Sequence, residues 1–207
     1  MAPKYKLTYI NRKGIAEYVR YLLAYLGEDF EDVRLDYDKW KSGSLKHTTP
    51  FGRIPYLEVD GKVLTQTIAI ARYLGKEAGL GGRNNWEDMQ IDIMADTIVD
   101  LRTPITLFMF DADEKAKKIK RDAYVNEMLP FYMKKLDAVV KENEGYLANK
   151  KLSWADFVFA SFIEFVNDNC DIPDPVTEYP HLKKLQQTVF SLPQIKKWRT
   201  DRPHTHH

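Results

Sequence analysis

The span from Pro50 to Leu74 constrains the fold of this 207-residue chain most, because it combines a proline, a tight turn and a helix start. Tyr56 to Val59 alternate between apolar and polar side chains, as in a strand with one buried face. Asp60-Gly61 is a two-residue turn, and Val63 to Thr65 is the returning strand. The span therefore predicts a β-hairpin that runs directly into a helix.

The start of that helix lies at Gln66-Thr67. Thr67 stands where an N-cap hydroxyl is expected, and the apolar residues after it continue at helical spacing. The free backbone N–H groups at such an end attract anions. Ile54-Pro55 opens the first strand, and a cis bond there would hold Ile54 in a fixed pose. The pattern alone is equally compatible with a small-ligand site and with plain scaffold.

The first 79 residues alternate between short strand-like and helical segments. Strands are predicted at 5–10 and 30–35, and an amphipathic helix at 15–26. Together with the hairpin and its helix, the order is βαβ followed by ββα, so we expect a small mixed sheet with helices on it. Glycine-rich residues 79–82 end this domain, and a linker is expected at 80–86.

The pattern from residue 87 to 207 is helical throughout. Apolar residues between Asp122 and Asn143 repeat at three and four residues, which predicts one buried seam. Pro104 and Pro130 lie inside helical patterns and are expected to bend or break them. Ser153 to Asp156 resembles a capping box and opens a helix that is apolar all round, hence central and buried. The predicted fold class is an α/β domain followed by an all-helical bundle.

The composition argues against several function classes. With 31 basic and 30 acidic residues the formal charge is +1, which gives no electrostatic case for binding nucleic acid or an anionic membrane. Cys170 is the single cysteine, so no intrachain disulfide or thiolate zinc cluster is expected. No apolar run approaches the roughly 20 residues of a bilayer span, so a cytoplasmic protein is expected. His204, His206 and His207 are interpreted as a frayed tail, and no metal site is expected.

Four motifs together resemble those of the cytosolic glutathione transferases, and most closely the sigma class, which includes invertebrate enzymes and the haematopoietic type of prostaglandin D synthase. They are YKLTY near the start, PFGRIPYLEVDG, QTIAIARYLGK, and LSWADF at Leu152 to Phe157. The resemblance covers essentially the whole chain. It implies a thioredoxin-like glutathione-binding domain at 1–79 and an all-helical domain at 87–207. It also implies a homodimer without a tightly bound cofactor, with glutathione as co-substrate.

The resemblance assigns catalysis to Tyr9, whose hydroxyl would activate the glutathione sulfur. A free thiol with a pKa near 8.5 is only a few per cent thiolate at neutral pH, and the thiolate is the nucleophile. A phenol with a pKa of about 10 stays protonated and can donate a hydrogen bond to the thiolate. Lowering the thiol pKa by about 2 units requires roughly 2.7 kcal/mol. Composition alone favours a core aromatic residue at this position, like Tyr5.

The remaining glutathione contacts are also implied by the resemblance. They run from the γ-glutamyl end, through the cysteinyl backbone pair, to the glycine carboxylate. In that order they are Gln66, Thr67, Ile54, Gly52, Arg53, Trp40 and Lys46. In addition, Asp100 would reach the γ-glutamyl amine from the other subunit.

The electrophile is expected between the two domains, beside the sulfur. The residues implied for this pocket are Ile10, Lys13, Gly14, Arg102, Thr106 and Leu107. An arginine in an otherwise apolar cleft favours a substrate with a polar or anionic part, such as an oxidised lipid product. One position departs from the family pattern: Ile15 stands where many sigma-type proteins carry an arginine near the thiolate. Lys13 and Arg12 are the candidates to replace that charge.

The expected function is conjugation of glutathione to small hydrophobic electrophiles, including aldehydes from lipid peroxidation, as in detoxification, with reduction of organic hydroperoxides beside it. Glutathione-dependent isomerisation of a prostaglandin endoperoxide is the alternative enzyme activity, and Ile15 weakens it. A non-catalytic crystallin or ligand carrier is the alternative from another class. A thiol-disulfide oxidoreductase is disfavoured, because Asn11 to Gly14 offers no cysteine at the first helix.

Overall fold

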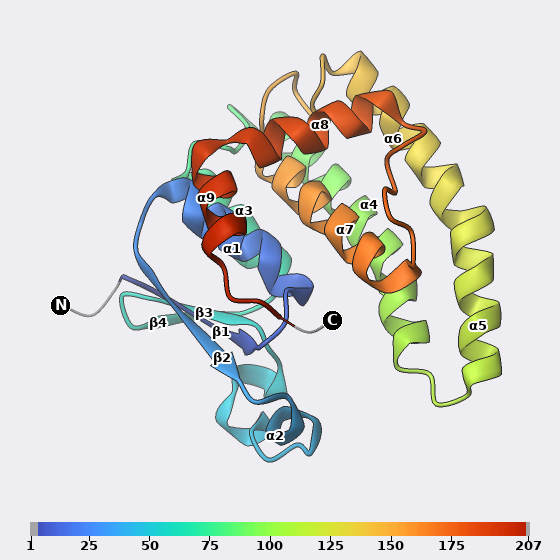
Figure 1. The fold of residues 1–207 in the computed structure, drawn as a ribbon. Helices are drawn as coiled ribbons and strands as arrows, with labels where there is room; N and C mark the ends of the chain where they lie inside the picture. Colours follow the sequence, from blue (N-terminus) through green and yellow to red (C-terminus); the bar gives the residue numbers. More distant parts are fainter. Residues whose placement is uncertain (1–3, 206–207) are drawn as a thin grey trace. The chain divides into compact units, whose positions relative to one another are not determined.

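The computed structural model describes residues 4–205 of the chain. Contacts within the chain divide it into two compact units, drawn in Figure 1. The first consists of the residues up to Gly79 together with those from Leu192 onward, and the second is Leu80 to Ser191. The domain limits predicted from the sequence placed residues after 191 in the helical domain. The contacts group them with the first unit, because the last helix packs on the first one.

The first unit contains a four-stranded mixed sheet with the strand order β2-β1-β3-β4. The strands are β1 (Tyr5–Ile10), β2 (Phe30–Leu35), β3 (Tyr56–Val59) and β4 (Lys62–Leu64). β1 pairs with β2 in parallel and with β3 antiparallel, and β3 and β4 form the predicted hairpin. The first three strands have the bounds predicted from the sequence, whereas β4 begins and ends one residue earlier.

Helices cover this sheet. They are α1 (Glu17–Leu26), α2 (Tyr37–Lys41), α3 (Thr67–Glu77) and α9 (Pro193–Asp201), with 3-10 turns at Gly14–Ala16, Lys46–Thr48 and Pro50–Gly52. α1 and α3 pack together on one side of the sheet, α9 packs on α1, and α2 lies on the opposite side (Figure 1). The predicted helix at 15–26 therefore begins as a 3-10 turn. Val19, Leu22 and Leu23 of α1 are fully buried, as the apolar stripe predicted.

The second unit is entirely helical among its described residues. It contains α4 (Asn85–Met109), α5 (Glu114–Ala123), a π-helical turn (Tyr124–Met128), α6 (Leu129–Glu142), α7 (Trp154–Cys170) and α8 (Pro180–Ser191). α7 packs against α4 and α8, and twelve of its seventeen residues are buried, so it is the predicted central helix. Its start is a capping box made by Ser153 and Asp156, which confirms that prediction.

The two prolines act differently. α4 is not broken at Pro104 and continues to Met109. Before Pro130, by contrast, the helical ladder changes to the π turn and α6 begins at Leu129. A proline cannot donate to the helical ladder, and Leu129 N, directly before Pro130, donates to Tyr124 O in the π pattern.

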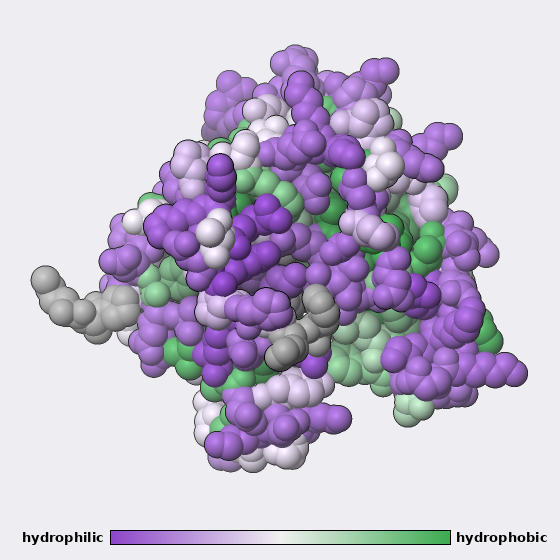
Figure 2. Space-filling model, viewed as in Figure 1, coloured by the Kyte–Doolittle hydropathy of each residue, from purple (hydrophilic) through white to green (hydrophobic). Residues whose placement is uncertain are grey.

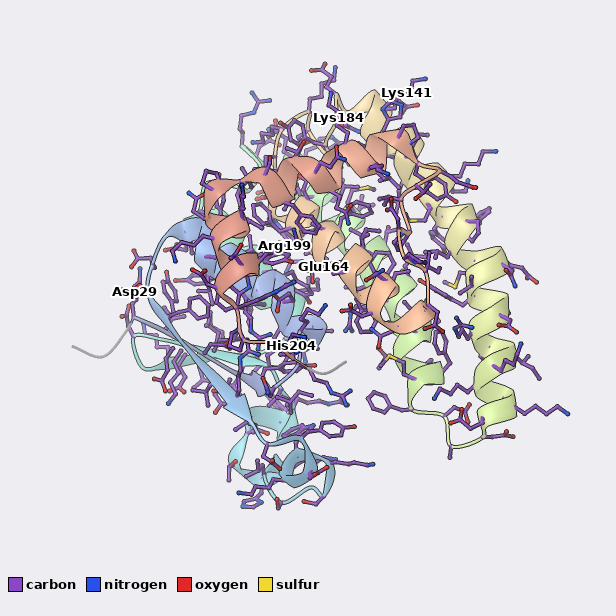
Figure 3. The ribbon with its side chains drawn as sticks, in the orientation of Figure 1. Asp29, Lys141, Glu164, Lys184, Arg199 and His204 are labelled. Atoms are coloured by element: carbon purple, nitrogen blue, oxygen red, sulfur yellow. The ribbon has the colours of Figure 1, made fainter. Side chains whose placement is uncertain are left out.

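The surface is largely polar, as expected for a chain with this charge content. Figure 2 shows hydrophilic side chains over most of the visible face, with smaller apolar patches between them. Lys141 on α6 and Lys184 on α8 point outward (Figure 3). No helix within residues 4–205 is long and apolar enough to cross a membrane.

Candidate active site

Tyr9 lies on β1, and its hydroxyl is fitted against the turn that precedes α1. Gly14 in that turn has φ +49°, and a Cβ atom there would lie 2.6 Å from Tyr9 Oη and 2.9 Å from Cε1. Tyr5 on the same strand is only 1% exposed, whereas Tyr9 is half-buried. Tyr9 thus differs from the core aromatic residue Tyr5. Its hydroxyl lies against the turn before α1, and this turn has room for the hydroxyl only because residue 14 is a glycine.

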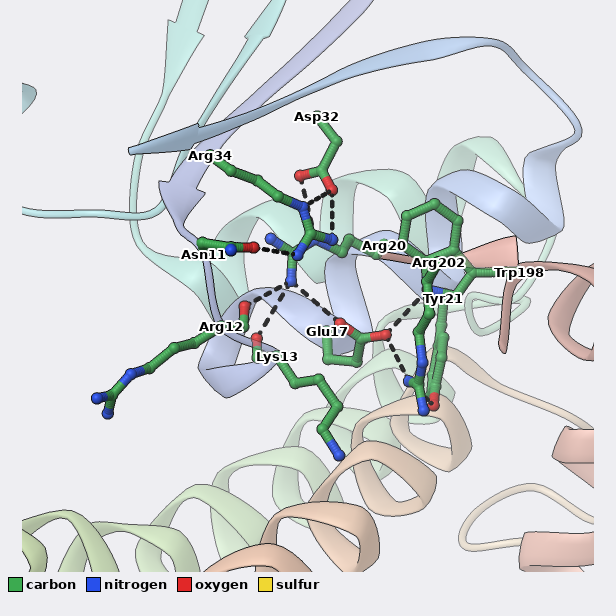
Figure 4. A network of polar contacts seen from close by, with 10 residues as sticks. All are labelled: Asn11, Arg12, Lys13, Glu17, Arg20, Tyr21, Asp32, Arg34, Trp198 and Arg202. Atoms are coloured by element: carbon green, nitrogen blue, oxygen red, sulfur yellow. Dashed lines mark hydrogen bonds and ion pairs between the residues drawn. The ribbon is translucent and has the colours of Figure 1, made fainter. Parts of the chain in front are cut away.

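A buried arginine, Arg20 on α1, holds that turn in place (Figure 4). Its Nη1 donates to the carbonyl oxygens of Arg12 and Lys13 at 2.9 and 3.3 Å. The same nitrogen donates to Glu17 Oε2 at 3.0 Å, and Nε donates to Asp32 Oδ1 at 3.1 Å. Because the side chain has no exposed surface, these charge-assisted bonds fix residues 12–13 to α1 and β2.

The guanidinium group of Arg20 also lies beside the tyrosine. Its Cζ is 6.0 Å from the centre of the Tyr9 ring, at the limit of a cation–π contact. Its Nη2 has no hydrogen-bond partner among the described residues. Sequence reasoning missed Arg20. The available signal was an arginine inside the run of otherwise apolar residues that α1 buries, three residues after Glu17.

Glu17 connects this arginine to the C-terminal helix. Its Oε1 accepts hydrogen bonds from Trp198 Nε1 at 2.9 Å and from Arg202 Nη1 at 2.7 Å. Arg202 also donates to Tyr21 Oη at 3.2 Å, and the Trp198 ring lies 5.4 Å from that of Phe30. Two oxygens of one buried carboxylate therefore bind α1 on one side and the end of α9 on the other.

The far side of the network reaches β2. Arg34 forms an ion pair with Asp32 Oδ2 at 2.8 Å and donates to Asn11 Oδ1 at 2.9 Å. Of the two cations proposed to replace an arginine at position 15, Arg12 stacks over the Tyr37 ring at 4.2 Å. Lys13 contributes its carbonyl oxygen to Arg20. A further cation, Arg20, has its guanidinium carbon 6.0 Å from the centre of the Tyr9 ring.

The predicted glutathione contacts of the first unit lie in the segments between β2 and β3 and between β4 and α3. Trp40 is half-buried in α2, and Lys46 is exposed at the start of a 3-10 turn. Gly52 has φ +62°, Arg53 is exposed and extended, and the Ile54–Pro55 peptide bond is cis. The predicted cis bond is confirmed.

The start of α3 differs from the prediction by one residue. Thr67 is the first helical residue, and the N-cap position belongs to Gln66, which makes no side-chain capping bond. Gln66 has φ +67° and ψ 106°, a conformation that costs a residue with a Cβ about 1–3 kcal/mol and that often occurs at binding sites. The tight passage from β4 into the helix forces the change of direction at Gln66. The first amides of α3 lack intrahelical acceptors and favour an anion.

The predicted electrophile residues of the second unit, Arg102, Thr106 and Leu107, lie within two turns of α4. Arg102 stacks on the Phe165 ring at 3.8 Å, which ties α4 to α7. Leu107 instead lines a pocket of about 620 Å³ within the helical unit. The other lining residues are Pro104, Phe108, Lys120, Ala123, Tyr124, Glu127, Met128, Phe131 and Tyr132. Ile10 is buried on β1, and Lys13 and Gly14 lie in the turn beside Tyr9.

No group of three or more metal-ligating side chains occurs within the described range of the chain. Of the three terminal histidines that the sequence analysis interprets as a frayed tail, His204 lies within the described residues, whereas His206 and His207 lie outside them.

Comparison with known proteins agrees with this fold. Residues 5–76 match the N-terminal domain model of glutathione S-transferases, and residues 99–202 match the C-terminal domain model. The chain is 43% identical over 203 residues to glutathione S-transferase S1 of Drosophila melanogaster, covering 97% of this chain and 80% of that protein. It is 36% identical to human haematopoietic prostaglandin D synthase, covering 98% of each chain.

A solved structure has the same fold. The prostaglandin synthase D of Nilaparvata lugens superposes with a TM-score of 0.92 at 46% identity, covering 98% of this chain and 100% of the other. The mixed four-stranded sheet followed by a helical unit is thus the fold of a glutathione S-transferase, and a separate family model matches the N-terminal and the C-terminal part of the chain. The chain belongs to the glutathione S-transferase family, as its motifs predicted. The family uses glutathione as co-substrate and holds no tightly bound cofactor.

Proposed function

We propose that the protein conjugates reduced glutathione to small hydrophobic electrophiles in the cytoplasm, with Tyr9 donating a hydrogen bond to the glutathione thiolate. The observation that carries this is the position of Tyr9. Its side chain is half-buried, its hydroxyl lies against Gly14, and its ring centre is 6.0 Å from the guanidinium carbon of the buried Arg20. The thiol loses its proton to solvent, and the sulfur then forms a bond to the electrophilic carbon. With 1-chloro-2,4-dinitrobenzene the C–Cl bond breaks and chloride leaves, whereas with 4-hydroxynonenal the C=C π bond breaks and a proton from solvent adds to the α carbon. A hydrogen bond to an ion is strong enough to favour the thiolate over the thiol.

The glutathione contacts proposed for Trp40, Lys46, Gly52, Arg53, Ile54, Gln66 and Thr67 are supported by backbone conformation. Gly52 and Gln66 both have positive φ; Gly52 ends a 3-10 turn before β3, and Gln66 stands directly before α3. The amides at the start of α3 suit the γ-glutamyl carboxylate, and the basic Lys46 and Arg53 suit the glycine carboxylate. The electrophile contacts of Ile10, Lys13, Gly14, Arg102, Thr106 and Leu107 remain proposals from the family resemblance.

We propose further that the protein is a homodimer. α4 carries an exposed apolar stripe of Trp86, Met89 and Ile93, spaced as on one helix face, and Trp86 is 68% exposed. Asp100 lies seven residues beyond Ile93, two turns further along the same face. If a second copy covers this stripe, Asp100 of each copy would lie at the edge of the interface. That position suits the proposed contact between Asp100 and the glutathione bound to the other copy.

The test is the initial rate with glutathione and 1-chloro-2,4-dinitrobenzene, run beside 4-hydroxynonenal, for the wild type and Tyr9→Phe. Turnover should fall sharply in the variant. The pKa of the bound thiol, followed by thiolate absorbance in the ultraviolet, should rise. Tyr5→Phe removes the same group from the same strand and should change neither. An unaltered thiol pKa in Tyr9→Phe would contradict the role of Tyr9.

Glutathione-dependent isomerisation of a prostaglandin endoperoxide is a second candidate, favoured by the similarity to proteins named prostaglandin D synthase. It needs the same thiolate, so a product assay with the endoperoxide separates the two activities. Retention on immobilised glutathione without turnover of any of these compounds would instead support a crystallin or ligand carrier.

A further inference from the structure

The polar network of Figure 4 joins the C-terminal helix to Arg20. The guanidinium carbon of Arg20 lies 6.0 Å from the ring centre of Tyr9, the tyrosine proposed to activate glutathione. We propose that the network is an electrostatic relay, in which Arg202 binds Glu17 and so leaves the positive charge of Arg20 available to stabilise the thiolate beside Tyr9. Arg202 and Arg20 are then positioning residues that act through other groups. This inference rests on the proposed role of Tyr9 and adds the source of the field that acts there.

The first support is the charge within the network. Its ionic side chains are three guanidinium groups, of Arg20, Arg34 and Arg202, and two carboxylates, of Glu17 and Asp32. Among these five groups, positive charges exceed negative charges by one. The side chains of Arg20 and Glu17 are 0% and 2% exposed, so water and salt screen their fields weakly.

The second support is the way Glu17 is shared. One of its oxygens, Oε2, faces Arg20, whereas Oε1 accepts from both Trp198 and Arg202. The negative charge of Glu17 is therefore divided between an arginine next to Tyr9 and an arginine at the end of α9. If Arg202 lost its charge, Glu17 would compensate Arg20 alone, and the excess at the tyrosine would disappear.

The third support is the position of Arg20 itself. Asp32 on β2, Glu17 on α1 and the carbonyl oxygens of residues 12 and 13 occupy Nε and Nη1, whereas Nη2 has no acceptor within the described part of the chain. Its guanidinium carbon lies 6.0 Å from the centre of the Tyr9 ring. A cation at this distance from Tyr9 stabilises negative charge on the Tyr9 oxygen, or on a glutathione sulfur that is hydrogen-bonded to the Tyr9 hydroxyl.

A purely structural role for the same contacts is the competing explanation, since buried ion pairs also hold elements together. The two explanations differ in the sign of one effect. Neutralising Arg202 removes a positive charge, and neutralising Glu17 removes a negative one. A structural latch is weakened by either change, but a relay must respond to them in opposite directions.

The experiment measures the pKa of the thiol of bound glutathione in Arg202→Gln, Arg202→Lys, Glu17→Gln and Lys197→Gln. Arg202→Gln should raise this pKa by on the order of one unit, and Arg202→Lys should restore most of the wild-type value. Glu17→Gln should lower the pKa. Lys197 pairs with Asp201 on the exposed face of α9, so Lys197→Gln removes the same charge away from Glu17 and should leave the pKa unchanged.

Two results would overturn the relay: an unchanged thiol pKa in Arg202→Gln, or shifts of the same sign in Arg202→Gln and Glu17→Gln. Tyr9→Phe is measured in parallel. If Tyr9→Phe leaves the thiol pKa unaltered, the proposed function fails, whereas a raised pKa in Tyr9→Phe with a wild-type value in Arg202→Gln removes only the relay. Chemical unfolding of each variant identifies any that does not fold. If Arg202→Gln does not fold, Glu17→Gln carries the test, because the relay requires a lowered thiol pKa there and an unchanged or raised pKa would overturn it.

Discussion

The Tyr9 hydroxyl and the Cα of Gly14 approach so closely that a methyl group on residue 14 would lie 2.6 Å from Oη. Gly14→Ala should therefore displace the tyrosine, raise the pKa of the bound thiol and lower kcat/KM. The left-handed φ of +49° adds about 1–2 kcal/mol of destabilisation. Gly27 has φ +73° and open space around it, so Gly27→Ala has a similar backbone cost without contact with Tyr9. Equal thiol pKa values in the two variants would contradict this account.

The apolar stripe on α4 predicts the effect of a charge at the proposed dimer interface. Ile93→Glu should convert the dimer to a monomer in light scattering, and it should weaken glutathione binding by roughly tenfold because the partner's Asp100 is lost. Ile119 on α5 is 60% exposed, so Ile119→Glu makes the same chemical change elsewhere and should leave both properties intact. A dimer that persists in Ile93→Glu would mean that the stripe is not the interface.

Asp156 predicts a pH dependence of stability that is opposite to the usual one for a carboxylate. Burial raises the pKa of Asp156 from 3.8 to about 6, although Leu147 N, Ser153 N and Ser153 Oγ donate to it. The folded state then binds the proton more tightly than the unfolded state. This contribution to the free energy of unfolding is present below about pH 4 and falls by about 3 kcal/mol as the pH rises through about 6. Denaturant unfolding across this range should show the slope in the wild type and not in Asp156→Asn.

Glu87 predicts the reverse. Hydrogen bonds from the side chain and then the backbone of Arg83 lower the pKa of Glu87 from 4.5 to about 2. Stability from this pair is present above about pH 4.5 and is lost as the pH falls toward 2. Arg83→Gln should raise the Glu87 pKa, measured by NMR titration of its carboxyl carbon, and Lys151→Gln, which removes a cation at 3.5 Å, should have a smaller effect. A larger shift in Lys151→Gln would contradict the assigned cause.

Local pattern was enough to predict the sheet and the central helix. The strands 5–10, 30–35 and 56–59 follow from alternation and turn residues, and the capping box at Ser153 follows from residue type and spacing. These features depend on neighbours in the sequence, so one chain suffices to find them.

The parts that sequence reasoning missed depend on contacts between distant residues. The role of Arg20 arises from Asp32 on a neighbouring strand and, through Glu17, from Arg202 at the end of α9. The α9 segment belongs to the first unit for the same reason. At the start of α3, Gln66 with its positive φ takes the N-cap position, although threonine is the residue type that favours it, and Thr67 becomes the first helical residue. Sequence patterns that repeat every one to four residues contain no information on the contacts of Arg20, on the placement of α9 or on the N-cap of α3.

The single cysteine has a consequence for a protein that handles reactive electrophiles. Cys170 is 1% exposed at the end of α7, and burial raises its pKa to about 12. It is therefore a protonated and inaccessible thiol under the conditions in which glutathione would be ionised at Tyr9. The folded chain therefore presents no thiol of its own to alkylating compounds. Alkylation of Cys170 would report that the helical unit has opened.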